Sequence, residues 1–239
     1  MHRFANPARF LRFSAAVLPW VAGGATLCIA AGLALGLVVS PADYQQGETV
    51  RIMYVHVPSA WMAMAAYTVV AGGSVSALVW RHPLGDLVAR AAAPIGAGFT
   101  LVCLVTGALW GKPMWGAWWV WDARLTSVLV LFFLYLGYIA LQNAFDDPTR
   151  GEKAAAILAI VGFVNVPIIK WSVDWWNTLH QPASVARLAG PAIHPAMLTP
   201  LLLMGAGFAL YFVAVLLLRV RAEIAARRIR ALRLATIEG

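Results

Sequence analysis

Six apolar runs dominate this chain of 239 residues and constrain its fold more than any other feature. A helix of about 20 residues spans the hydrocarbon core of a bilayer, which is about 30 Å thick. The six runs cover residues 17–39, 59–80, 91–109, 125–141, 154–169 and 196–218. We therefore predict an all-α integral membrane protein, with residues 1–239 forming a single polytopic domain. The first run is longer than the core of a signal peptide, which has about 7–15 residues, and this favours a true span.

The composition agrees with a protein whose solvent is lipid. Hydrophobic residues make up 62% of the chain and charged residues only 12%, whereas roughly a quarter of the residues of a soluble domain are charged. Gly32 and Gly36 stand at GxxxG spacing in the first run, a pattern typical of closely packed membrane helices.

The basic residues predict the orientation of the chain. Thirteen of the 18 lie at the termini and in the two loops on the same side, namely Arg3, Arg9, Arg12, Arg81, Arg90, Arg150, Lys153, Arg219, Arg221, Arg227, Arg228, Arg230 and Arg233. The opposite side holds five, namely Arg51, Lys112, Arg124, Lys170 and Arg187. The positive-inside rule then predicts that both termini are cytoplasmic. The net charge of +8 reflects this topology and attracts anionic lipid; no folded domain for reading nucleic acid surrounds the basic tail.

Several kinds of chemistry have no counterpart in the sequence. Cys28 and Cys103 lie far apart in two predicted spans, so they are interpreted as buried apolar residues rather than a redox or zinc pair. A nucleophile with its base, a pair of acids and a nucleotide loop of the GxxxxGK type are all missing. The sequence therefore predicts a protein that is not an enzyme.

Two histidines stand on the outer side, opposite the termini. His56 precedes the second span and His180 follows the fifth, and each is two residues before a proline and close to aromatic residues. Proline disfavours helix in the residue before it, so both histidines are expected at the edge of irregular backbone. Two neutral imidazoles can occupy both axial positions of a haem iron. His194, at the outer start of the sixth span, is the competing candidate, whereas His2 and His82 are expected to be solvated on the inner side.

A tryptophan-rich segment, residues 110–127, lies between these histidines in the sequence. The stretch WGAWWVWDAR contains Trp115, Trp118, Trp119 and Trp121 within seven residues. If the segment is helical, the first three share one face with Asp122, and Trp121 points elsewhere as an interfacial anchor. Such a face suits a large, flat and mostly apolar ligand such as haem. An ordinary aromatic belt at the membrane interface is the alternative interpretation.

Haem propionates need cations, and the outer loops contain three candidates. Arg124 lies within the segment, Lys112 just before it, and Arg51 in the preceding outer loop. Arginine can bind a carboxylate through two parallel hydrogen bonds. Asp122 is expected to orient Arg124 or to cap the fourth span, because Asp is a good N-cap residue.

The tryptophan and histidine segments carry a family resemblance. WGAWWVWDARLTS, residues 115–127, resembles the WWD-domain signature of the haem-handling membrane proteins of cytochrome c biogenesis. MYVHVPSAW, residues 53–61, and WWNTLHQPAS, residues 175–184, are similar to the histidine segments of one family within that superfamily, haem exporter protein C (CcmC). The likeness covers essentially the whole chain and the order of its three motifs.

The resemblance implies a function that composition alone does not. Family members hold haem b transiently at the periplasmic face of the bacterial inner membrane, above the tryptophan segment, with two axial histidines that correspond to His56 and His180. They present it to the haem chaperone CcmE. The small membrane subunit CcmD and the ABC transporter subunits CcmA and CcmB complete the assembly. None of the histidines falls inside a predicted span, so a haem path through this chain's own bundle is not predicted.

Other membrane functions are compatible with six spans. A structural or substrate-translocating subunit of an ABC-type exporter would also have polar outer loops, with its tryptophans forming an interface for partners. A channel or ion-coupled transporter is disfavoured, because the predicted spans lack the interior acids and bases that mark ion paths.

Overall fold

The structure, a computed structural model, describes residues 6–180, 184–185, 187 and 189–238. In this part of the chain the regular structure is helical. The α-helices are α1 (Pro7–Ala34), α2 (Met53–Trp80), α3 (Gly85–Trp115), α4 (Ala123–Leu141), α5 (Pro148–Gly162), α6 (Asn165–Trp175) and α7 (Pro195–Glu238). A π-helical turn, Leu35–Val39, follows α1, and a 3-10 turn, Glu48–Ile52, precedes α2. Among the described residues, six helical stretches are long and apolar enough to cross a membrane. The predicted all-α membrane fold is confirmed.

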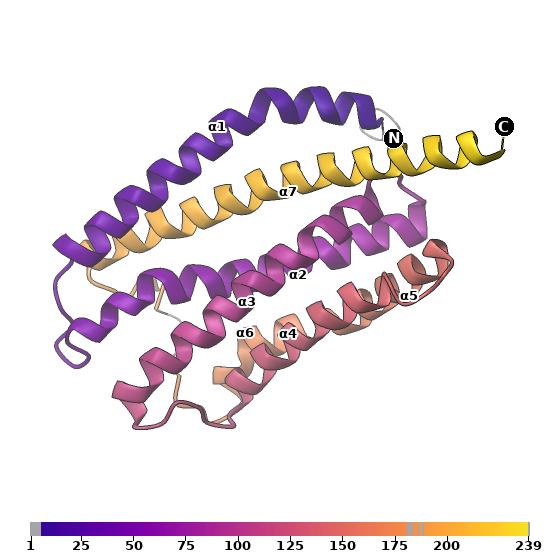
Figure 1. Ribbon diagram of the computed structural model, residues 1–239. Helices are drawn as coiled ribbons and strands as arrows, with labels where there is room; N and C mark the ends of the chain where they lie inside the picture. The colour runs from indigo at the N-terminus through magenta and orange to yellow at the C-terminus, as the bar shows by residue number, and fades with distance from the viewer. Residues whose placement is uncertain (1–5, 181–183, 186, 188, 239) are drawn as a thin grey trace.

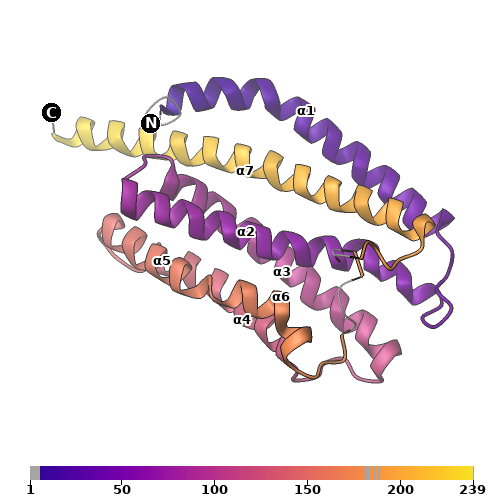
Figure 2. The same cartoon turned by 180° about the vertical axis from the view of Figure 1, so that it is seen from behind.

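The helices run side by side in one bundle with two distinct ends. In Figure 1, α7 lies between α1 and the pair formed by α2 and α3, while α4, α5 and α6 cover the other side of that pair. The view from behind shows the same order (Figure 2). The last turns of α1, α3 and α6 lie at one end, which we call the outer end, and the start of α1 and the end of α7 lie at the other, the inner end. The termini therefore share a side, as six spans require.

Glycines let α1 and the π-helical turn that follows it approach their neighbours closely. A Cβ atom on Gly32 would lie 2.8 Å from Cγ of Met204 on α7, and one on Gly36 would lie 2.7 Å from the Tyr54 ring. Both glycines of the GxxxG pattern are therefore buried at packing interfaces, as the sequence predicted.

The main core lies between α2, α3, α4 and α5 and combines small residues with tyrosines. Alanines of α3 bring its backbone close to α2, because a methyl side chain keeps neighbouring helices close together. Tyr67 and Tyr135 are fully buried with their rings 5.1 Å apart. Tyr135 donates a hydrogen bond of 2.7 Å to the Ala63 carbonyl, so α4 is joined to α2 in the middle of the bundle.

The fifth membrane crossing is interrupted, which the single predicted run at residues 154–169 did not anticipate. α5 ends at Gly162 and α6 begins at Asn165. Pro167 lacks an N–H to donate to Phe163, so the helical ladder cannot continue through this point. The side-chain amide of Asn165 donates to the Ser127 carbonyl at 2.8 Å and attaches the interruption to α4.

The helices also extend beyond the predicted spans. α1 begins at Pro7 with Asn6 as its N-cap, and α7 continues as a helix well past residue 218 at the inner end. α3 passes through Gly111 and Pro113 and ends at Trp115, so neither residue interrupts the helix. A Cβ on Gly111 would lie 3.0 Å from the Trp115 ring, so the two residues pack closely at the last turns of α3.

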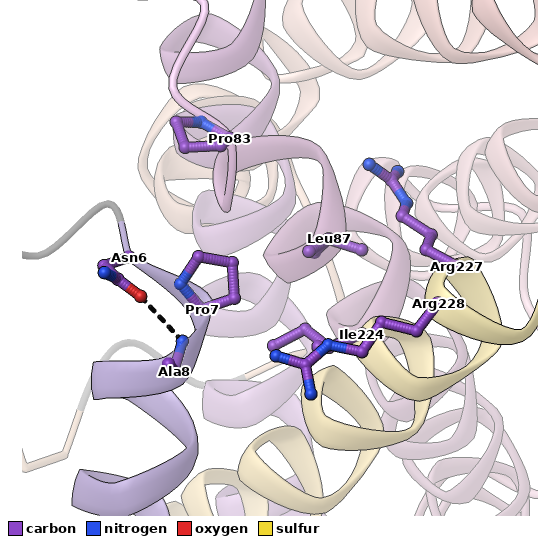
Figure 3. A pocket seen from close by; sticks show the side chains of 8 residues that line it. All are labelled: Asn6, Pro7, Ala8, Pro83, Leu87, Ile224, Arg227 and Arg228. Carbon is purple, nitrogen blue, oxygen red and sulfur yellow. Dashed lines mark hydrogen bonds between the residues drawn. The ribbon is translucent and has the colours of Figure 1, made fainter. Parts of the chain in front are cut away.

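A cavity of about 300 Å³ opens at the inner end (Figure 3). It is lined by Asn6, Pro7, Ala8, Pro83, Leu87, Ile224, Arg227 and Arg228. Arg227 forms ion pairs with Asp86 and Glu152, which neutralise much of its charge. The lining is largely apolar, and the cavity lies at the opposite end from the two outer histidines.

Candidate functional site

His56 lies in the second α-helix rather than at the edge of irregular backbone, so that expectation is wrong. α2 begins at Met53 and contains both His56 and Pro58. Met53 and Tyr54 are buried against α7, and this packing stabilises the first turn despite the proline. The helix that contains His56 is one of the six long enough to cross a membrane, and His56 lies near its outer end.

The His56 imidazole is held by the neighbouring helix α3. Its Nδ1 lies 3.1 Å from the Cys103 carbonyl and 3.1 Å from the Thr106 hydroxyl. The Trp110 ring meets it edge-on at 5.7 Å, and the Trp110 indole N–H donates to Gln46 at 2.9 Å. A ring whose Nδ1–H is bonded to a carbonyl presents Nε2 to a ligand. Cys103 thus contributes its backbone here, with its side chain buried as predicted.

His180 follows α6 in irregular backbone, as the sequence predicted. Its ring lies 5.0 Å from that of Trp115, the last residue of α3. Its Nδ1 lies 3.6 Å from Oδ2 of Asp122. Both atoms are buried and have no hydrogen-bond partner among the described residues. Burial lowers the pKa of His180 below its ordinary value, and the Asp122 carboxylate opposes that shift. The neutral form, which can bind a metal, is therefore favoured at neutral pH.

Both histidines contact the last turns of α3. His56, on α2, contacts Thr106 and Trp110, and His180, which follows α6, contacts Trp115. Arg124 lies in the first turn of α4, two residues after Asp122, which faces His180. Segments more than 120 residues apart in the sequence therefore meet at one site.

The tryptophan segment is not helical beyond Trp115, so the predicted shared helical face is wrong. Gly116 takes a left-handed conformation with φ of 75° and ends α3, as glycine often does at a helix C-terminus. Residues 117–122 are irregular. Trp118 is 56% exposed and Trp121 is 75% exposed, while Trp119 is half-buried with its ring 5.5 Å from that of Trp121. The indoles therefore form an open, uneven surface beside His180.

Asp122 ends the irregular segment and caps the next helix. Its Oδ1 accepts a hydrogen bond of 2.7 Å from the backbone N–H of Leu125. The sequence-based prediction that Asp122 caps the fourth span is confirmed. Oδ2 is the oxygen that faces His180.

The three cations proposed for the propionates have different surroundings. Arg124 donates through Nε to the Ser172 hydroxyl at 3.1 Å and through Nη2 to the Ile169 and Lys170 carbonyls, so much of its guanidinium fastens α4 to α6. Lys112 lies over the Trp118 ring and donates to the Gly116 carbonyl at 3.0 Å. Arg51 pairs with Glu48 and donates to the Gly36 carbonyl.

The remaining histidines have other surroundings. His194 is exposed, and its Nδ1 accepts from the Ala196 N–H at 3.2 Å at the start of α7. His82 accepts from the Leu84 N–H in the turn before α3. His2 lies outside the described residues.

Some contributors to the site are not evident from the sequence. Thr106 positions His56 from within α3, where it resembles an ordinary residue of a span, whereas Trp110, which contacts the His56 ring, is the first residue of the tryptophan-rich segment. Near the outer end of α6, Trp171, Trp175 and Trp176 are about half exposed with successive rings 5.7 and 5.8 Å apart. They extend the aromatic surface of the outer end beyond the segment that the sequence singled out.

The donor set suits haem iron better than a bare metal ion. Within the described residues no group of three or more His, Cys, Asp or Glu side chains could hold an ion. Two imidazoles beside indoles instead match the axial ligands and apolar contacts of a haem. The buried Trp119 Nε1 lacks a hydrogen-bond partner among the described residues, as expected of a polar group beside a ligand.

Comparisons with known proteins agree with this chemistry. A family model described as heme exporter protein C matches residues 1–235. A protein of that name from Bradyrhizobium diazoefficiens is 55% identical over 96% of this chain and 87% of its own length. That from Haemophilus influenzae is 50% identical over 94% of this chain and 91% of its own.

A third relative has a different description. A ccmC-like mitochondrial protein of Marchantia polymorpha, described as concerned with cytochrome c biosynthesis, is 53% identical over 73% of each chain. With identities near one half over almost the whole sequence, and a family model that matches nearly every residue, this multi-pass membrane protein belongs to the heme exporter protein C (CcmC) family.

Proposed function

We propose that this protein binds haem b transiently at the periplasmic face of the bacterial inner membrane and passes it to the haem chaperone CcmE for cytochrome c maturation. His56 and His180 are the axial ligands of the iron. Trp115, Trp118, Trp119, Trp121 and Asp122 form the surroundings of the ring, and Arg124, Lys112 and Arg51 are the propionate partners. Haem is the cargo, and the protein performs no catalysis on a substrate of its own.

The observation that carries this proposal is the convergence of two imidazoles at the outer end. His56 is fixed through Nδ1 by α3, and His180 presents a buried Nδ1 to a carboxylate. Each arrangement leaves Nε2 as the coordinating atom. A bis-imidazole haem needs two such rings, and two separate elements, α2 and the segment after α6, supply one imidazole each.

The proposed orientation rests on two features: both termini lie on the same side of the bundle, and most of the basic residues lie on that side. Cytoplasmic termini put the outer end in the periplasm, where CcmE would receive haem. CcmD and the ABC subunits CcmA and CcmB are the proposed membrane partners, and lipid covers the apolar faces. No nucleic acid partner is proposed.

The exposed indoles offer a first test of transfer. Replacing Trp118 and Trp119 together by Ala should lower haem retention or CcmE loading by about tenfold or more, because stacking and apolar contact with a flat ligand are lost. Purified protein is assayed for haem content and for covalent haem on CcmE. A matched Trp20→Ala variant, which removes an 82% exposed indole of α1, should leave both unchanged. Full haem content and normal CcmE loading in the double variant would show that the segment is an ordinary aromatic belt.

Gly107 provides a second test, aimed at His56. A Cβ on this residue would lie 3.0 Å from Cε1 of His56, so the ring must shift to admit a larger side chain. Gly107→Val should weaken haem binding by about 10- to 100-fold, the usual cost of disturbing the groups that orient a ligand. Titration of the purified variant with haem measures this change in affinity. Gly98→Val on the same helix, where a Cβ meets nothing within 4 Å, is the control. Equal haem affinity in the two variants would exclude a role of the Gly107 contact in holding His56.

The alternative is a structural or substrate-translocating subunit of an ABC-type exporter, whose indoles only dock partners. Such a protein needs no ligand-ready imidazoles, and loss of both histidines would leave its assembly and transport unchanged. Haem-free protein that still supports haem delivery to CcmE would favour this alternative.

A further inference from the structure

Asp122 has two carboxylate oxygens with separate surroundings. Oδ1 caps α4 through the Leu125 N–H, and Oδ2 points toward His180 Nδ1 at 3.6 Å. The Asp122 side chain is only 6% exposed, and Oδ2 is buried with no hydrogen-bond partner among the described residues. Capping therefore accounts for one oxygen and leaves the other unexplained.

Nearby cations do not satisfy this oxygen. Arg124 is two residues away, yet its described hydrogen bonds go to Ser172, Ile169 and Lys170 of α6. Among the described residues, His180 is the one ion-pair partner of Asp122. A buried carboxylate oxygen without a donor is costly, so the His180 N–H is the group that the site provides for it.

The His180 ring and its main chain make further contacts. Trp115 contacts it nearly edge-on, with the ring planes inclined by 64°. The His180 backbone N–H donates to the Thr178 hydroxyl at 2.9 Å, which holds the main chain. Nδ1 lies 3.6 Å from Oδ2, so a shift of a few tenths of an ångström would bring the two atoms within hydrogen-bond distance.

We infer that Asp122 is a positioning residue that accepts the His180 Nδ1–H, fixes the tautomer with Nε2 unprotonated, and directs Nε2 to the haem iron. The inference rests on the proposed function. His56 is oriented by a neutral carbonyl and hydroxyl, whereas His180 faces a carboxylate, so the two ligands are unequal. An anionic acceptor increases the electron donation of a ligating imidazole and stabilises ferric over ferrous iron.

Asp122→Asn separates this role from capping. Asparagine retains an oxygen for the Leu125 N–H and is as good an N-cap as aspartate. Its amide group can donate to His180 Nδ1, which favours the tautomer with a proton on Nε2 and blocks coordination. We expect haem affinity to fall by about 10- to 100-fold and the reduction potential of the haem that remains to shift to a more positive value. Asp147→Asn, which changes the N-cap of α5 at the inner end, should change neither.

Imidazole rescue distinguishes positioning from general disturbance. In His180→Gly, added imidazole should occupy the vacated position and restore the low-spin spectrum. In the double variant His180→Gly with Asp122→Asn, restoring that spectrum should need an imidazole concentration at least about tenfold higher than in His180→Gly alone. Asp122→Ser, which also caps but has no second oxygen, should behave like Asp122→Asn and provides the test if that variant is unstable.

The outcomes separate the two claims. If the unchanged protein binds haem and His180→Gly responds to imidazole, but Asp122→Asn leaves affinity, potential and imidazole requirement unchanged, the role of Asp122 is wrong and the proposed function stands. If the unchanged protein binds no haem, both are wrong.

Discussion

Replacing His56 or His180 by alanine is expected to abolish the six-coordinate, low-spin haem spectrum while the protein still inserts in the membrane. Each variant loses one of two axial imidazoles, so the iron becomes five-coordinate or binds a weaker ligand. The double variant should retain less than a tenth of the haem of the unchanged protein. Absorption spectra of purified ferric and ferrous protein, normalised to polypeptide, measure the effect.

His194 and His82 provide the matched controls for these variants. His194→Ala removes an exposed histidine at the same end, and His82→Ala removes one at the inner end. Both should keep the unchanged spectrum, because neither histidine is a proposed ligand of the iron. An unchanged spectrum in His56→Ala and His180→Ala, or its loss in His194→Ala, would show that the axial assignment is incorrect.

The second large effect is expected on folding, from Gly96→Val in α3. A Cβ on Gly96 would collide with the ring and hydroxyl of Tyr135. That tyrosine is fully buried and donates to the Ala63 carbonyl, so it cannot move without losing a core hydrogen bond. Overpacking lowers the free energy of unfolding by about 1–3 kcal/mol. A buried Tyr135 hydroxyl that has lost its hydrogen bond lowers it by about 1–3 kcal/mol more. The variant should accumulate poorly and unfold at lower temperature.

Gly98→Val on the same helix is the control for this folding effect. Nothing lies within 4 Å of a Cβ on Gly98, so a side chain there meets lipid rather than a neighbouring helix. Its thermal unfolding in detergent should match that of the unchanged protein. Similar unfolding temperatures for the Gly96 and Gly98 variants would indicate that α3 and α4 are not packed as described.

The sequence predicted the helical membrane class because the apolar runs are governed by the bilayer thickness, which acts locally on each segment. It also predicted the cap at Asp122 and the close packing at Gly32 and Gly36, since each follows from one residue type at one position. These features depend little on what the rest of the chain does.

Other features depended on contacts between distant segments. Helical spacing suggested that Trp115, Trp118 and Trp119 share a face, but Gly116 takes the left-handed conformation and ends α3. Pro58 suggested irregular backbone around His56, but packing of the α2 start against α7 keeps it helical. The interruption at residues 163–164 had a signal in Pro167, which is lost in an average of hydropathy along the run.

The candidate site also combines features that follow from single residues with features that depend on contacts between distant segments. The sequence identified both outer histidines from their residue type and place, and in the structure both contact the last turns of α3. The hydrogen bonds of Arg124 to α6 and of His56 to α3 could not be predicted, because they depend on which helices become neighbours.

Electron paramagnetic resonance of the oxidised protein, purified from cells that make haem, tests the central claim most directly. Two neutral or carboxylate-bonded imidazoles on one ferric iron should give a low-spin signal, with about one haem per polypeptide. The signal should disappear in the His56→Ala and His180→Ala variants, which should still be recovered from the membrane. A protein without haem, or one with a high-spin signal that neither substitution changes, would contradict the account.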